Sequence, residues 1–176
     1  MRQVLLKRFA VVLVFCTVVI ALFVGKPLQQ RYPWLIFVLP YSAFLFFLLH
    51  ATSLAIGAFR NPIYTKLRSA AAGFGLVVSP FLLLGISNLL VHQPIEEVHL
   101  VKYGLLAYFL YAAQRHSTPL RRFLNAFCLA SFVGISEETA QIWVPDRIFD
   151  YRDMLLNASG CLFGTLYAKL VEFALV

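Results

Sequence analysis

The stretch that decides the fold is "FLNAFCLASFVGISEETAQIWV", residues 123–144. At 1.5 Å per residue, a helix of this length reaches about 33 Å, close to the roughly 30 Å hydrocarbon core of a bilayer. Its only charged residues are Glu137 and Glu138, about 22 Å from its start by the same rise per residue. The stretch therefore predicts a membrane-spanning helix with an acidic pair near one end.

Five more apolar runs of similar character flank this one, at residues 9–24, 34–59, 70–91, 98–113 and 154–175. The fourth run is short, so we extend it back to Ile95. The composition agrees with this pattern, with 61% hydrophobic and 13% charged residues and a mean hydropathy of +0.80. We expect an all-α, polytopic transmembrane bundle of about six spans, forming a single domain over residues 1–176.

Lys and Arg residues concentrate on one side of these six spans, and the positive-inside rule makes that side cytoplasmic. The cytoplasmic set is Arg2, Lys7, Arg8, Arg60, Lys66, Arg68, Arg115, Arg121, Arg122 and Lys169, and the opposite set is Lys26, Arg31, Arg147 and Arg152. Both termini are therefore expected in the cytoplasm of a multi-pass cell-membrane protein. Contact with anionic lipid explains the net charge of +7, so we expect membrane lipids as partners and no nucleic acid.

Polar residues gather at the predicted outer, non-cytoplasmic ends of the last three spans, where helical spacing aligns them in stripes. The stripes are Glu96, His99 and Tyr103, then Glu138 and Gln141, then Asp153, Asn157, Gly160 and Gly164. Ionisable groups at this depth are costly and usually face a bundle interior or a wet cavity. We expect the stripes to converge, with the two glycines allowing a close helix approach. Adjacent helical residues point about 100° apart, so Glu137 and Glu138 cannot both face one point equally.

Two segments carry a family resemblance: "IEEVHLVKYGLL" at residues 95–106 and "EETAQIWVPDRIFDYRDMLLNASGCLFG" at residues 137–164. Their acid-x-x-His-x-x-x-Tyr, acidic pair, Gln, Pro-x-Arg, Asp and Asn-x-x-Gly order resembles the VanZ-like membrane family over residues 96–164. The chain departs from that pattern at Ala140, where many members carry His, and at Glu97, where Lys is expected.

This resemblance implies a bacterial inner-membrane protein of the cell envelope. The founding member is linked to resistance to teicoplanin, a glycopeptide that acts on cell-wall precursors outside the membrane. An outward-facing polar site suits that setting. The ligand it implies is a lipid-linked envelope precursor or a glycopeptide, and the resemblance does not define a reaction.

One hypothesis is an enzyme that acts on a lipid-linked phosphate or acyl group by acid and base chemistry. His99 is then the base and Glu138 the acid or orienting group, with Glu137 and Asp153 as further catalytic candidates. The expected ligand-binding residues are Glu96, Tyr103, Gln141, Arg147 and Asn157, with Arg147 as an anion clamp.

Other hypotheses use the same residues. The cluster could recognise an envelope lipid or antibiotic without chemistry, as an accessory protein does, or form part of a transporter. It could also only hold helices together. No cofactor and no metal is expected from the spacing, which contains no H-x-x-x-H or C-x-x-C pair. Mixed nitrogen and oxygen donors are nevertheless present in His99, Glu138, Asp153 and Asn157.

Overall fold

The computed structural model describes residues 96–114, 117–145 and 149–175, together with shorter pieces between residues 9 and 85. Regular structure in this part of the chain is helical, with no strand, in agreement with the predicted all-α fold. The continuous helices are α4 (Glu96–Ala113), α5 (Pro119–Gln141) and α6 (Tyr151–Leu175).

These three helices correspond to the last three predicted spans. The predicted spans at residues 9–24, 34–59 and 70–91 lie largely outside the described residues. The count of six spans and the position of the termini therefore stay predictions.

Helices α5 and α6 both begin earlier than hydropathy predicts, because their first turns are polar. Thr118 is the N-cap of α5, and its side chain accepts a hydrogen bond from the backbone N–H of Arg121, while Pro119 opens the first turn. At α6, Asp150 Oδ1 accepts a 2.8 Å hydrogen bond from the backbone N–H of Arg152. Such caps satisfy backbone donors that a helix leaves unpaired, and Pro loses nothing at this position.

Helix α4 packs closely against α6 through glycine. A Cβ atom added at Gly104 would lie 3.3 Å from the carbonyl oxygen of Gly160, and one added at Gly164 would overlap the Gly104 backbone. An added Cβ at Gly160 would likewise overlap the backbone of Leu100. The prediction that Gly160 and Gly164 allow a close helix approach is confirmed. This contact sets the register between α4 and α6.

The helical piece at residues 47–53 packs on the far half of α6. The rings of Phe47 and Tyr167 meet edge to face with centroids 5.0 Å apart. The Tyr167 hydroxyl lies 3.0 Å from His50 Nδ1 and 3.2 Å from the Phe47 carbonyl oxygen. His50 thus has a structural partner within the bundle.

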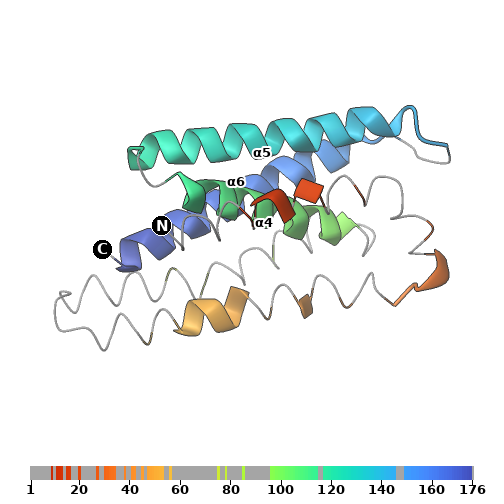
Figure 1. Cartoon of the computed structure of the whole chain (residues 1–176). Helices are drawn as coiled ribbons and strands as arrows, with labels where there is room; N and C mark the ends of the chain where they lie inside the picture. Colours follow the sequence, from red (N-terminus) through yellow and green to blue (C-terminus); the bar gives the residue numbers. More distant parts are fainter. Residues whose placement is uncertain are drawn as a thin grey trace.

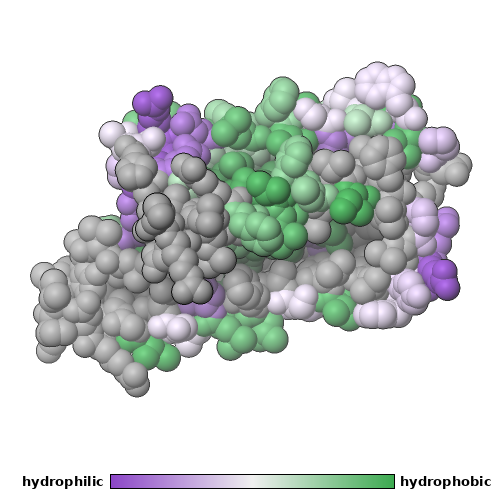
Figure 2. All heavy atoms as spheres, viewed as in Figure 1, coloured by the Kyte–Doolittle hydropathy of each residue, from purple (hydrophilic) through white to green (hydrophobic). Residues whose placement is uncertain are grey.

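The outer surface of the helices is strongly apolar. Exposed large hydrophobic residues on α5 and α6 are Leu120, Leu124, Leu129, Phe132, Ile135, Tyr151, Leu155, Leu162, Leu166 and Phe173. On the face drawn in Figure 2, hydrophobic residues gather across the middle and hydrophilic residues lie toward the two ends. A soluble protein rarely exposes so much apolar surface, whereas a surface that faces lipid does.

By length and composition, the segment Tyr151–Phe173 of α6 is able to cross a membrane. No other helix among the described residues meets the same criterion. For α4 the reason is charge, since the helix carries Glu96, Glu97 and Lys102 within its 18 residues. Whether α4 can cross a membrane therefore depends on whether its charged side chains face lipid or the interior of the bundle.

Candidate functional site

The predicted polar stripes meet at one end of the three-helix unit. Helix α5 runs opposite in direction to α4 and α6, so its C-terminal end lies beside their N-terminal ends (Figure 1). His99 comes from the second turn of α4, Glu138 from the last turn of α5 and Asp153 from the first turn of α6. The predicted convergence of the stripes is confirmed for these three residues.

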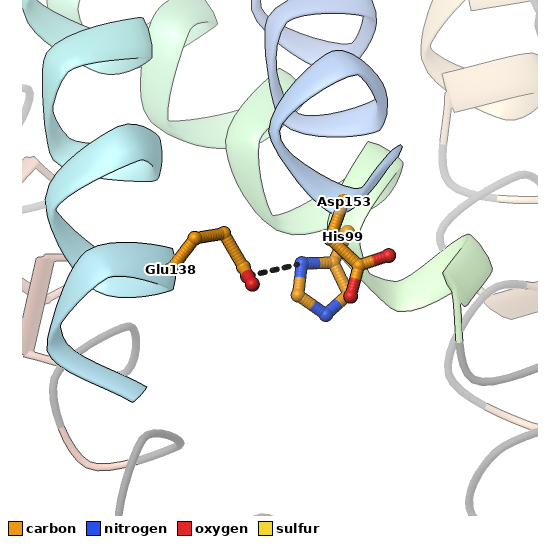
Figure 3. A group of neighbouring side chains, drawn as sticks. All are labelled: His99, Glu138 and Asp153. Atoms are coloured by element: carbon orange, nitrogen blue, oxygen red, sulfur yellow. Dashed lines mark ion pairs between the residues drawn. The ribbon is translucent and has the colours of Figure 1, made fainter. Parts of the chain in front are cut away.

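The three side chains lie close enough to act together. One ring nitrogen of His99 and one carboxylate oxygen from each of Glu138 and Asp153 lie within 4.8 Å of one another. The imidazole lies between the two carboxylates, and its Nδ1 atom is 3.6 Å from Glu138 Oε1 (Figure 3). Glu138 is fully buried, while 16% of the His99 side chain is exposed. We call these three residues the His–acid cluster.

Two carboxamides hold the His–acid cluster in place. Gln141 Nε2 donates a 2.8 Å hydrogen bond to Glu138 Oε1, one turn along the same helix. Asn157 Oδ1 lies 3.0 Å from His99 Nδ1, and Asn157 Nδ2 donates to the Gly134 carbonyl oxygen at 3.3 Å. Both carboxamides are buried. They therefore fix the rotamers of the groups that they contact.

The Asn157 bonds also determine the histidine tautomer. Because Nδ2 donates to a carbonyl oxygen, the other atom of this carboxamide facing His99 is the oxygen, which only accepts. His99 Nδ1 must then carry the proton. In the neutral ring this leaves the lone pair on Nε2, the nitrogen able to take a proton or bind a metal.

Glu137 belongs to a second, closed group beside the first. Its carboxylate accepts hydrogen bonds from Lys102 Nζ at 2.6 and 2.8 Å and a further one from the Tyr103 hydroxyl. Lys102, Tyr103 and Glu137 have little or no exposed side-chain surface. As the 100° step between neighbours predicts, Glu137 and Glu138 do not face one point: Glu137 contacts Lys102 and Tyr103, and so connects α5 to α4.

A glycine makes room for this arrangement. A Cβ atom added at Gly134 would lie 2.9 Å from the Cβ of Asn157 and 3.3 Å from the Tyr103 ring. Any larger residue there would push α5 away from α6. The absence of a side chain at Gly134 also lets Asn157 Nδ2 reach the Gly134 carbonyl oxygen, to which it donates a hydrogen bond.

The other predicted ligand-binding residues have mixed outcomes. Tyr103, Gln141 and Asn157 all lie in or beside the cluster, as described above. Arg147 lies outside the described residues. Glu96 is half-buried in the first turn of α4 and contributes negative charge near Asp153.

Lys102 is the residue that sequence reasoning missed. It lies one turn after His99 on α4, with its ammonium group 4.9 Å from the centre of the Tyr103 ring. An ionisable residue inside a predicted span was the signal that could have found it.

A separate ion pair joins the helices at the opposite end. Arg122 from the start of α5 pairs with Glu172 near the end of α6, and the Tyr111 hydroxyl donates to the same carboxylate. The guanidinium also lies 5.0 Å from the centre of the Tyr111 ring. This group contacts none of the cluster residues and is explained by helix packing.

Fold and site together define a class: a helical protein with a membrane-competent helix and a His–acid cluster enclosed by three helix ends. The family model described as VanZ/LLP1 matches residues 5–172, nearly the whole chain. The protein belongs to the VanZ/LLP1 family, which confirms the resemblance and extends it beyond residues 96–164. No curated protein and no solved structure matches the chain.

Proposed function

We propose that this VanZ/LLP1-family protein is a multi-pass membrane protein whose His–acid cluster faces the non-cytoplasmic side of the cell membrane. The apolar outer surface of α5 and α6 and the membrane-competent length of α6 support the membrane placement. The Lys and Arg distribution supports the orientation, because the positive-inside rule predicts a cytoplasmic location for the Arg122 end of the bundle. The cluster then lies at the outer interface.

The ligand we propose is the polar head of a lipid-linked envelope molecule, with a phosphate as its reactive or recognised group. Such a head lies at the depth of the outer helix ends, where the cluster is. Arg147, in the connection between α5 and α6, is the proposed anion clamp. A planar guanidinium binds phosphate in a bidentate manner.

The observation that carries the proposal is the pairing of half-buried His99 with fully buried Glu138. A histidine with a proton on Nδ1 presents the Nε2 lone pair as a base, and a buried carboxylate nearby stabilises the imidazolium that forms after proton transfer. We assign proton acceptance to His99, positioning to Glu138, and a ligand-facing role to half-buried Asp153. Glu137 is assigned a packing role because Lys102 and Tyr103 occupy its carboxylate.

Recognition without chemistry is the alternative, in an accessory protein that changes tolerance to glycopeptides. The buried carboxamides of Asn157 and Gln141 favour it, because they hold the cluster rigid, as a recognition surface requires. The two proposals share their residues and differ only in whether the bound ligand is converted.

Native mass spectrometry of the protein extracted gently from its own membrane tests the proposal. The variants are His99→Gln, Glu138→Gln and Arg147→Ala. Glu172→Gln is the matched control, since it makes the same carboxylate-to-amide change in the ion pair at the opposite end. We expect a lipid-linked phosphate on the wild type and on the control, and its loss from the three site variants.

Incubating the identified lipid with the wild type then separates the two proposals. Conversion that His99→Gln abolishes supports an enzyme, and binding without conversion supports recognition. If all four variants and the wild type carry the same bulk phospholipids, the proposed ligand class is wrong.

A further inference from the structure

The His–acid cluster combines the donor types that bind divalent transition metals. Its ring nitrogen and two carboxylate oxygens come from three different helices and lie within 4.8 Å of one another. Ligands arranged tetrahedrally around one Zn²⁺ at about 2.0–2.2 Å lie roughly 3.3–3.6 Å apart. Binding one ion to all three donors therefore requires the Glu138 and Asp153 side chains to move closer to the His99 ring.

Charge also favours a cation at this position. Glu138 and Asp153 are two carboxylates beside one imidazole, and Glu96 and Asp150 add further negative charge near Asp153. Arg152 and Lys102 oppose that charge. However, Lys102 makes two hydrogen bonds to Glu137, so much of its charge is already balanced. An anionic phosphate approaching the cluster would meet like charge unless a cation lies between them.

The surrounding hydrogen bonds match those around known metal ligands. A metal-bound histidine usually donates its other ring N–H to an oxygen, and His99 Nδ1–H donates to Asn157 Oδ1. A metal-bound carboxylate is usually hydrogen-bonded too, and Gln141 donates to Glu138. The bond to Asn157 holds the His99 ring with the lone pair on Nε2. Glu138 Oε1 lies on the Nδ1 side of that ring, 3.6 Å from Nδ1, so the Glu138 side chain must rotate to share an ion with Nε2 (Figure 3).

We propose that His99, Glu138 and Asp153 bind one divalent transition-metal ion, which in turn holds the phosphate of the lipid-linked ligand. The imidazole favours Zn²⁺ or Mn²⁺ over Ca²⁺ and Mg²⁺, which prefer oxygen donors alone. Only the phosphate part of this statement rests on the function proposed above. The metal site rests on the cluster itself.

Metal titration of the purified full-length protein tests the site. The protein is isolated through a tag without histidine, stripped with a chelator and titrated with Zn²⁺ and Mn²⁺ by calorimetry, with bound metal counted by elemental mass spectrometry. We expect one ion per chain. The loss of affinity in His99→Gln and Asp153→Asn should exceed the roughly 10- to 100-fold that outer-shell changes cause.

Asp150→Asn is the matched control. Asp150 is a nearby acid outside the donor set, and Asn can still accept the Arg152 N–H bond at the start of α6. Its metal affinity should stay within about threefold of the wild type. Asn157→Leu removes the outer-shell acceptor and should weaken binding by about 10- to 100-fold.

X-ray absorption at the zinc edge identifies the donor atoms around the ion. It uses the wild type, so the result does not depend on whether a variant folds. We expect one nitrogen donor with the remaining donors oxygen. A protein that binds no ion, a sulfur-containing shell, or affinity unchanged in His99→Gln overturns the metal site. If the lipid co-purifies but no metal binds, the metal proposal is wrong while the proposed function stands.

Discussion

His99 Nδ1 lies 3.0 Å from Asn157 Oδ1, and this contact joins the first helix of the three-helix unit to the last. The other end of the same carboxamide donates to the Gly134 carbonyl oxygen on α5. One buried side chain thus connects all three helices, and it also determines which histidine nitrogen carries the proton. Fold and site depend on the same residue.

Replacing Asn157 by Leu should therefore destabilise the bundle by about 1–2 kcal/mol, the range expected for two hydrogen bonds within a membrane protein. Thermal unfolding in detergent measures the change. Asn125→Leu is the control, since Asn125 makes one 3.1 Å bond to Gln114 at the opposite end. An equal loss in both variants would contradict a special role for Asn157.

Gly164→Ala and Gly160→Ala should each lower the free energy of unfolding by about 1–3 kcal/mol, the usual cost of overpacking. The added methyl groups would overlap the backbones of Gly104 and Leu100, which cannot rotate away as a side chain can. Gly85→Ala should change stability little, because no atom of the described residues lies within 4 Å of its added Cβ. Denaturant unfolding of the three variants checks the ranking, and stability equal to wild type at Gly164 would disprove the close contact.

Removing one partner of the Lys102–Glu137 pair should cost about 3–5 kcal/mol, because the remaining charge is buried without compensation. Lys102→Met and Glu137→Gln test this separately. The double variant should recover a substantial part of the sum, since neither charge then remains. A thermal-unfolding double-mutant cycle measures the coupling, and purely additive losses would argue against a direct pair.

If the metal site exists, Zn²⁺ should stabilise the wild type by mass action. An ion that binds only the folded protein contributes about 2.7 kcal/mol at a concentration of 100 Kd. The thermal midpoint of the wild type should rise with added Zn²⁺ and return after chelation. His99→Gln should show no such rise, and a rise of equal size there would assign the effect to other sites.

Much of the candidate site follows from helical spacing. His99 and Tyr103 lie one turn apart on α4, and Glu138 and Gln141 do so on α5, so their shared faces are local properties of a helix. The 100° step between neighbours likewise requires Glu137 and Glu138 to face apart. The cost of ionisable groups within a membrane adds the expectation that these faces meet.

The partners themselves required the tertiary structure. Lys102 pairs with Glu137 at a sequence separation of 35 and Arg122 with Glu172 at a separation of 50, and neither pair is a repeat that periodicity reveals. Hydropathy also could not find the start of α5, because Thr118 acts through a hydrogen bond to the backbone and Pro119 through its fixed φ, and neither acts through burial.

The sequence by itself determined that the chain forms apolar helices with polar stripes, because hydrophobicity and the 3.6-residue period are properties of consecutive residues. Only the tertiary structure decided which polar stripes contact one another, and at which positions along the helices they meet. That choice depends on helix rotation and register, which the backbone contacts of Gly104, Gly160 and Gly164 and the space left by Gly134 determine. Those contacts bring His99 close to Glu138 and Asp153, while Glu137 forms an ion pair with Lys102.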